Sequence, residues 1–263
     1  MVYPTTLSGG MSRLHKAPVA LVLAAAVTTF AAADAFAGRV KIAVATNFAM
    51  AARDIGQAFE TATAHHPVFS FGSTGQLYAQ ISQAAPFDIF LAADQARAQL
   101  AIDRGFAVTE SRFTYATGRI VLFSHLPGLV MSQQTLRTGS VDRIAVANPA
   151  TAPYGAAAVQ AMRALGVYAQ LETKIVQGAN IAQTYQFVAT GNADVGFVAL
   201  SQVKHGAPGS QWVVPLDLHQ PIAQDAVLLR NGAGNVAAHA FLSFLRGQEA
   251  GHIKEKYGYS AEE

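Results

Sequence analysis

Four short segments of this chain each lead from an apolar run, through small hydroxyl, amide or glycine residues, into a helix-like pattern. They are Ala45-Thr46-Asn47-Phe48, Gly72-Ser73-Thr74-Gly75, Ala152-Pro153-Tyr154-Gly155 and Gly178-Ala179-Asn180-Ile181. A helix N-terminus offers unpaired backbone N–H groups and a partial positive charge. Several such termini converging on one point would hold an anion without lysine or arginine. The pattern therefore predicts an oxyanion-binding site.

The N-terminal residues 1–37 match the three regions of a secretory signal. Arg13 and Lys16 precede an apolar run that ends near Ala33, and a small-x-small site closes at Ala37. An uncleaved membrane anchor is the alternative, but the apolar run is short for a membrane span. We expect cleavage after Ala37, which leaves 226 of the 263 residues and places the protein in the periplasm.

Charge and cysteine content exclude several classes of function. Removal of residues 1–37 takes away two basic residues and one acidic residue and leaves 16 basic and 15 acidic side chains. Such a balance provides no basic field for nucleic acid or an anionic membrane. The chain has no cysteine, so thiol catalysis, zinc thiolates and disulfides are excluded.

Apolar runs of strand length alternate with segments whose apolar residues recur every three or four positions. This alternation predicts an α/β fold with mostly parallel sheets flanked by helices. The expected strands cover residues 40–45, 68–71, 88–92, 119–123, 143–147, 174–176, 194–199, 212–216 and 223–229. The expected helices cover residues 48–63, 75–83, 95–104, 154–165, 180–190 and 235–245.

The length of the mature chain is compatible with one large domain or with two lobes of about 100 residues each. A polar stretch over residues 124–139 interrupts the alternation, which favours two lobes. We expect lobe I to comprise residues 38–120 plus 222–263 and lobe II residues 121–221. The chain would then cross twice between them and form a hinge, with the ligand in the cleft, since α/β sheets bind ligands where strands turn into helices.

The first two segments also have simpler interpretations. Thr46 or Asn47 could act only as helix caps, although both side chains can donate to an oxyanion. The segment from Gly72 to Gly75 lets backbone amides approach a ligand closely, but it could be a plain turn with a cap. It lacks the lysine of a Walker loop and the Gly-x-Ser-x-Gly frame of a nucleophile elbow.

The other two segments begin helices. Pro153 stands at a favoured early position, and Tyr154 could place a phenolic O–H among the amides or could be a half-buried tyrosine with its hydroxyl at the surface. Asn180 is a typical cap, and the backbone N–H of Ile181 would be the donor there.

Side-chain metal binding and acid–base catalysis are both disfavoured. His65 and His66 are adjacent, so they would not share a helix face, and no metal-binding histidine spacing occurs. Asp88, Asp94 and Asp194 lie at strand ends, where aspartates usually cap helices or accept bonds from backbone amides.

Five motifs in order make the chain resemble the periplasmic molybdate-binding proteins of ABC importers, the ModA family. They occupy residues 45–48, 72–81, 85–94, 148–155 and 193–200, and the resemblance runs from about Arg39 to Tyr257. It implies a class II periplasmic-binding-protein fold. The two lobes would close over molybdate or tungstate and deliver the ion to a membrane permease, with no chemical step and no cofactor. We expect a monomer that does not bind nucleic acid.

The resemblance implies a set of oxyanion contacts and two departures from the family pattern. Many members have serine at the positions of Asn47 and Thr74, but both replacements keep a hydrogen-bond donor. Many members also have a binding tyrosine at the position of Ala199 and a small residue at that of Tyr154, so the phenol here comes from the other loop. The implied contacts are Thr46, Asn47, Thr74, Tyr154 and Ile181, with Ser73 beside them.

Two other functions remain open at this point. A receptor of the same fold could take sulfate, phosphate or a small organic acid. A small hydrolase could use Ser73 or Thr74, but neither hydroxyl has a recognisable base in fixed relation to it.

Overall fold

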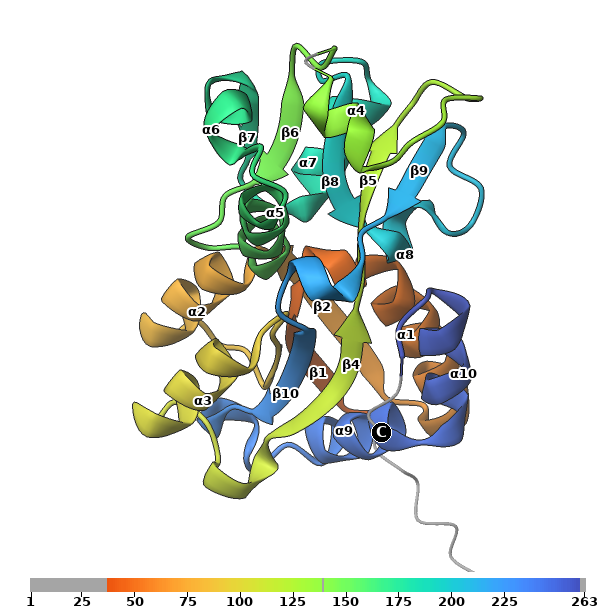
Figure 1. Cartoon of the computed structure of the whole chain (residues 1–263). Coiled ribbons are helices and arrows are strands. Elements are labelled where there is room, and N and C mark those ends of the chain that lie inside the picture. Colours follow the sequence, from red (N-terminus) through yellow and green to blue (C-terminus); the bar gives the residue numbers. More distant parts are fainter. Residues whose placement is uncertain (1–36, 139, 261–263) are drawn as a thin grey trace, which may run out of the picture. The chain divides into compact units, whose positions relative to one another are not determined.

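The computed structural model describes residues 37–138 and 140–260. Strands and helices alternate along the chain, as the sequence predicts (Figure 1). These residues belong to a single compact unit. The expected secretory signal lies almost wholly outside the described residues. In the part of the chain that is described, no helix has the length and apolar character needed to cross a bilayer.

The described strands form two sheets of five. The first sheet has the order β2-β1-β3-β10-β4. Its strands are β1 (Arg39–Ala45), β2 (His66–Gly72), β3 (Ile89–Leu91), β4 (Phe113–Gly118) and β10 (Ile222–Leu228). The second sheet has the order β7-β6-β8-β5-β9. Its strands are β5 (Ile120–Ser124), β6 (Ile144–Ala147), β7 (Ile175–Gly178), β8 (Val195–Ala199) and β9 (Ser210–Val213).

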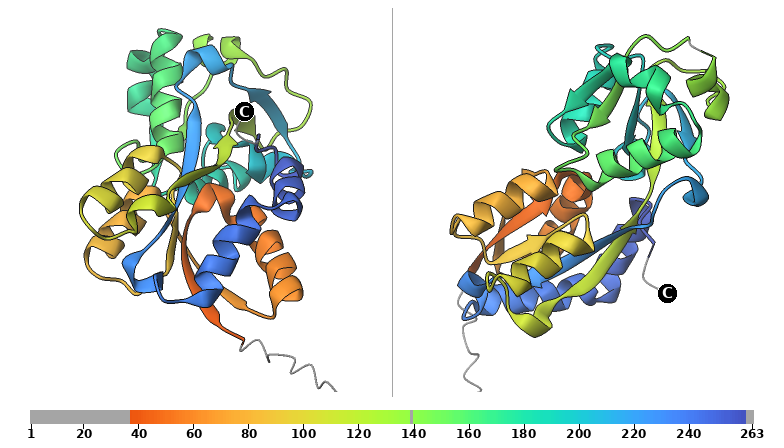
Figure 2. Two further views of the ribbon diagram at one scale, coloured as in Figure 1. Left: turned by 90° about the horizontal axis from the view of Figure 1, so that it is seen from below. Right: turned by 60° about the vertical axis from the view of Figure 1, so that its left-hand side comes forward.

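Helices cover both faces of each sheet (Figure 2). The first sheet packs against α1 (Ala49–Thr63) and α9 (Val236–Arg246) on one face and α2 (Thr74–Ser82) and α3 (Gln95–Asp103) on the other. The second sheet packs against α5 (Pro153–Ala164) on one face and α7 (Ile181–Ala189) and α8 (Leu200–Val203) on the other. The remaining helices are α4 (Gln133–Arg137), α6 (Tyr168–Leu171) and α10 (Gln248–Lys256), with short 3₁₀ helices such as η1 (Thr46–Phe48). Each sheet with its helices is called a lobe below.

The two-lobed α/β fold is confirmed, but the sheets are more mixed than the sequence predicts. In each sheet two strand pairs are parallel and two are antiparallel. The antiparallel pairs all involve β10 in the first sheet and β5 in the second. Parallel neighbouring strands are joined by a helical crossover. β10 and β5 instead follow a passage of the chain from one sheet to the other, so each can run antiparallel to its neighbours.

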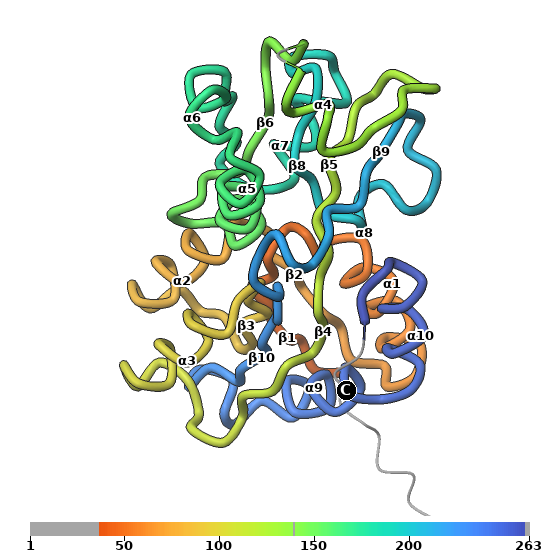
Figure 3. The backbone as a smooth tube through the Cα atoms, viewed as in Figure 1, coloured from red at the N-terminus to blue at the C-terminus, as the bar shows by residue number. Residues whose placement is uncertain are grey.

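The chain passes between the sheets at two adjacent places (Figures 1 and 3). β4 ends at Gly118 and β5 begins at Ile120, while the return reaches β10 at Ile222, which pairs with Gly118. The register of β10 against β4 shifts between Gln224 and Asp225, so that Tyr115 has no partner in the ladder. Bulges of this kind re-aim side chains, and both Tyr115 and Gln224 contribute to the site described below.

The strands that differ most from the sequence prediction lie at the edges of the sheets. β2 starts at His66 and includes Pro67, two residues before the expected start. Proline is tolerated there because β2 is an edge strand. β4, the strand at the opposite edge of the same sheet, was not predicted. Outside the sheets, helix α10 was not predicted either. The strand expected over 212–216 is observed at Ser210–Val213.

Candidate functional site: a polar cavity between the lobes

The four segments that lead from strands into helices, beginning at Ala45, Gly72, Ala152 and Gly178, converge on one small cavity between the lobes. Its volume is about 10 Å³, which is close to the space that one water molecule needs. All six predicted site residues line it: Thr46, Asn47, Ser73, Thr74, Tyr154 and Ile181. The other lining residues are Ala45, Gly72, Ala93, Ala152 and Pro153, so no charged side chain faces the cavity.

The first wall is the N-terminus of η1, directly after β1. No side chain caps this helix, and among the described residues none accepts a hydrogen bond from the Asn47 N–H. The Thr46 hydroxyl likewise has no hydrogen-bond partner in the described part of the chain, and the residue is half-buried. Simple capping is therefore the wrong interpretation for Thr46 and Asn47, and both residues leave donors open.

The second wall is the N-terminus of α2, where Ser73 is the cap. The Ser73 hydroxyl accepts from the Gln76 N–H at 3.3 Å, and the Gln76 side chain accepts from the Ser73 N–H at 3.2 Å. The Thr74 hydroxyl accepts from the Ala93 N–H at 3.0 Å. Each hydroxyl thus uses an oxygen lone pair within the protein, which leaves its own hydrogen to donate. The Thr74 N–H has no acceptor among the described residues.

The N-terminus of α7 shows how a cap can leave one donor free. The Asn180 side-chain oxygen accepts from the N–H groups of Ala182 and Gln183, both at 3.0 Å. The preceding N–H, that of Ile181, has no acceptor in the described structure. Ile181 is buried, so its N–H needs a partner from the cavity, because an unpaired buried amide is costly.

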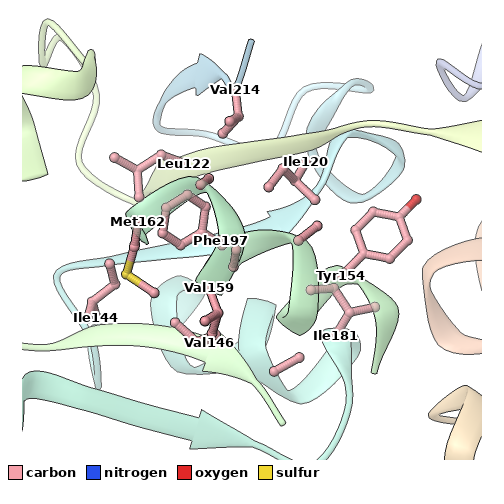
Figure 4. Packing of buried hydrophobic residues seen from close by; sticks show 14 of the residues in the cluster. Ile120, Leu122, Ile144, Val146, Tyr154, Val159, Met162, Ile181, Phe197 and Val214 are labelled. Atoms are coloured by element: carbon pink, nitrogen blue, oxygen red, sulfur yellow. The ribbon is translucent and has the colours of Figure 1, made fainter. Parts of the chain in front are cut away.

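Tyr154 stands at the N-terminus of α5, after Pro153, and its side chain is 2% exposed. The interpretation as a half-buried tyrosine with a surface hydroxyl is therefore wrong. Its N–H has no acceptor among the described residues. Its hydroxyl accepts from the Asn47 and Gln224 side-chain amides, both at 3.4 Å. Figure 4 shows the Tyr154 oxygen pointing away from the other labelled side chains of its apolar cluster.

The Tyr154 hydroxyl belongs to a buried group of neutral side chains from both lobes, here called the interlobe cluster. The Gln224 side-chain oxygen accepts from Asn47 at 2.7 Å and from Tyr115 at 3.2 Å. The Tyr259 hydroxyl donates to the Asn47 carbonyl at 2.7 Å, and Ser201 of the second lobe donates to the same carbonyl at 2.8 Å. The cluster consists of Asn47, Tyr115, Tyr154, Ser201, Gln224 and Tyr259.

The phenols of the interlobe cluster remain protonated at neutral pH. Burial raises the pKa of Tyr259 to about 12 and holds the pKa values of Tyr154 and Tyr115 well above their usual range. The sequence signals missed Gln224 and Tyr259, because neither lies near the four segments. Only the β10 bulge and the docking of the C-terminal residues bring them to the site.

The aspartates and histidines whose chemistry could serve catalysis or metal binding have structural partners elsewhere. Asp88 accepts from the Lys41 N–H at 2.7 Å, Asp94 caps α3, and Asp194 accepts from two backbone N–H groups. The interpretation of these aspartates as caps and backbone acceptors is confirmed. His65 and His66 bond to Gly38 and Glu60 respectively. Among the described residues, no group of three potential metal ligands occurs.

Two lobes with a neutral, donor-lined cavity between them are the arrangement of a two-lobed solute-binding protein. Known proteins support this assignment. A family model for bacterial extracellular solute-binding proteins matches residues 40–260. The molybdate-binding protein ModA of Rhodobacter capsulatus is 47% identical over 260 residues, covering 99% of both chains. ModA of Azotobacter vinelandii is 48% identical over 257 residues, covering 96% of this chain and 99% of its own.

A solved structure agrees over the whole of its length. The periplasmic molybdate-binding protein of Azotobacter vinelandii superposes with a TM-score of 0.83 at 38% identity, covering 85% of this chain and 100% of that one. The chain therefore belongs to the bacterial extracellular solute-binding protein family and, within it, to the ModA family. It is a binding protein of the transport type rather than an enzyme.

Proposed function

We propose that this protein captures molybdate and tungstate in the periplasm by closing its two lobes around the ion and delivers it to an ABC permease. The observation that carries the proposal is the convergence of four N–H groups, those of Asn47, Thr74, Tyr154 and Ile181, on one cavity without charged walls. None of them has an acceptor among the described residues. The hydroxyls of Thr46, Ser73 and Thr74 add to this donor set. The names of the ModA relatives specify molybdate, which supports that part of the proposal.

The donor set suits a fully ionised dianion. Molybdate and tungstate carry no proton at neutral pH and need only donors, whereas a phosphate site profits from an acceptor for the remaining proton. The lining includes no carboxylate. Each helix terminus adds only on the order of 1 kcal/mol, so affinity must come from several preorganised hydrogen bonds acting together.

The residues that line the cavity come from both lobes, which gives closure its role. Thr46, Asn47, Ser73 and Thr74 follow strands of the first sheet, whereas Tyr154 and Ile181 follow strands of the second. With a volume of about 10 Å³, the cavity is smaller than an ion with four oxygens needs. The ion would therefore enter when the walls are further apart, and closure would complete its hydrogen bonds.

The lobe boundaries and the secretion route belong to the same proposal. The lobes would comprise residues 38–120 plus 222–263 and residues 121–221, except that Ile120 already belongs to β5 of the second sheet. The hinge would lie at the two passages next to Gly118 and Ile222. Cleavage after Ala37 would release a monomer of 226 residues into the periplasm. Mass spectrometry of the secreted protein gives the cleavage site, and light scattering gives its mass in solution.

Titration calorimetry of the mature protein with molybdate, tungstate, sulfate and phosphate tests the proposal. We expect molybdate and tungstate to bind in a 1:1 complex and to compete with each other, with sulfate and phosphate much weaker. A protein that binds sulfate best would be a receptor for another oxyanion. Absence of binding to either of the metal oxyanions would contradict the proposal.

A further inference from the structure

We infer that two residues of the first lobe, Gly75 and Arg97, form a clamp on the loop 149–152 of the second lobe and set how long the closed form lasts. The inference rests on the proposed function. The Gly75 N–H donates to the Thr151 carbonyl at 2.8 Å. The Arg97 guanidinium donates to the adjacent carbonyl, that of Ala150, at 2.6 Å. These two carbonyls immediately precede the part of the chain that lines the cavity.

Gly75 is a glycine because of its neighbour rather than its backbone conformation. Its φ lies outside the left-handed region that favours glycine. A Cβ at position 75 would lie 2.9 Å from the Thr151 Cα and 3.0 Å from its Cβ. Real Cβ atoms do not approach a backbone atom so closely, so any side chain here would push the loop away from α2. The lobes reach this arrangement only because position 75 has no side chain.

Arg97 is fixed on its own lobe before it reaches the other. Asp94 accepts from the Arg97 N–H at 2.8 Å and from its guanidinium at 2.5 Å. This carboxylate orients the planar guanidinium, whose other nitrogen is then directed at the Ala150 carbonyl. Arg97 lines a cavity of about 280 Å³ that shares Ala93 and Pro153 with the binding cavity. It therefore lies beside the ion's site without lining it.

The clamp acts through the loop on the donors of the second lobe. Ala152 caps α5, and the Tyr154 N–H lies two residues further on. When the loop is held against the first lobe, this N–H is held at the cavity opposite the N-termini of η1 and α2. Loss of the clamp leaves the ion's own donors intact but makes the open form easier to reach. The effect should therefore appear in the dissociation rate rather than the association rate.

Two variants with matched controls test the clamp in the mature protein. Arg97→Ala removes the guanidinium, and Arg104→Ala removes an exposed charge at the end of the same helix as its control. Gly75→Ala adds the obstructing Cβ, and Gly251→Ala is its control, because a Cβ at position 251 in α10 meets nothing within 4 Å. Alanine also favours helices over glycine, so Gly75→Ala should not weaken α2 itself, and thermal melting of the variant beside its control shows what the displaced loop costs in stability.

Release of radiolabelled molybdate into excess unlabelled molybdate gives the dissociation rate. We expect this rate to rise about tenfold in Arg97→Ala, in line with the loss of one charge-assisted hydrogen bond, and tenfold or more in Gly75→Ala. The dissociation rate of Arg97→Lys should lie between those of Arg97→Ala and the parent. A lysine keeps the positive charge but lacks the planar guanidinium, whose two terminal nitrogens reach Asp94 and Ala150 at once. Both control variants should match the parent.

A distance between the lobes gives a readout that does not depend on affinity. The chain has no cysteine, so spin labels attach only at cysteines that are introduced. Ser82→Cys in α2 and Ala164→Cys in α5, both at exposed positions, provide one labelling site on each lobe. We expect a longer mean distance in Gly75→Ala than in the parent pair, with molybdate present or absent. Equal distances together with equal release rates would overturn the clamp.

The proposed function and the clamp fail in distinguishable ways. A parent protein that shows no molybdate binding by calorimetry contradicts the proposed function, while the label distances still support or overturn the clamp. A parent that binds molybdate, with Arg97→Ala and Gly75→Ala both indistinguishable from their controls, overturns the clamp alone.

Discussion

Replacement of Ile181 by proline removes one proposed donor, the Ile181 N–H, and keeps the helix α7 that carries it intact. Proline lacks the N–H but is favoured at the first position of a helix, which is where Ile181 stands in α7. The preceding Asn180 has φ −155° and ψ 174°, an extended conformation that the residue before proline prefers. The Asn180 cap bonds to Ala182 and Gln183, so Ile181→Pro leaves the cap intact.

The expected magnitude follows from the single lost hydrogen bond. A hydrogen bond to a charged group contributes about 1.5 to 3 kcal/mol, so the dissociation constant for molybdate should rise about 10- to 150-fold. The change also truncates a residue that is only 3% exposed. This truncation should lower the free energy of unfolding by about 2 to 5 kcal/mol. This second effect must be separated from the first.

Ile181→Ala is the matched control, because it truncates the same side chain but keeps the N–H. Calorimetry should give a near-parental dissociation constant for Ile181→Ala and a weakened one for Ile181→Pro, while thermal melting shows similar losses of stability in both. Equal affinities in the two variants would refute the role of the Ile181 N–H as an ion donor.

Two further predictions concern the interlobe cluster. Tyr154→Phe removes a hydroxyl 3.4 Å from both the Asn47 and Gln224 amides, so the molybdate dissociation constant should rise less than tenfold in calorimetry. A 100-fold rise would mean that the phenol contacts the ion directly. Tyr259 has a pKa raised to about 12 from 10.0, so its stabilisation is complete below pH 10 and is lost as the pH rises from 10 to 12. In denaturant unfolding, the fall in stability over this range should be about 2 to 3 kcal/mol smaller in Tyr259→Phe than in the parent, and an equal slope in the variant would contradict this.

The sequence by itself determined the helices and most of the strands that carry the site. The helices predicted at 75–83, 154–165 and 180–190 are observed within one residue of those bounds. Capping and apolar periodicity depend on residues three or four positions apart, so a single sequence contains the information. The same local signals identified the residues that line the cavity.

Only the tertiary structure decided which atom of each residue faces the cavity and what holds the lobes together. The Tyr154 hydroxyl accepts from Gln224, 70 residues away, and the backbone N–H remains as its open donor. Gly75 was expected to let amides approach a ligand, but it is also the point where α2 meets Thr151. Such contacts join residues that are distant in sequence and are selected by the packing of one lobe on the other. Local propensity cannot encode them, because the same cap or turn forms whatever lies opposite it.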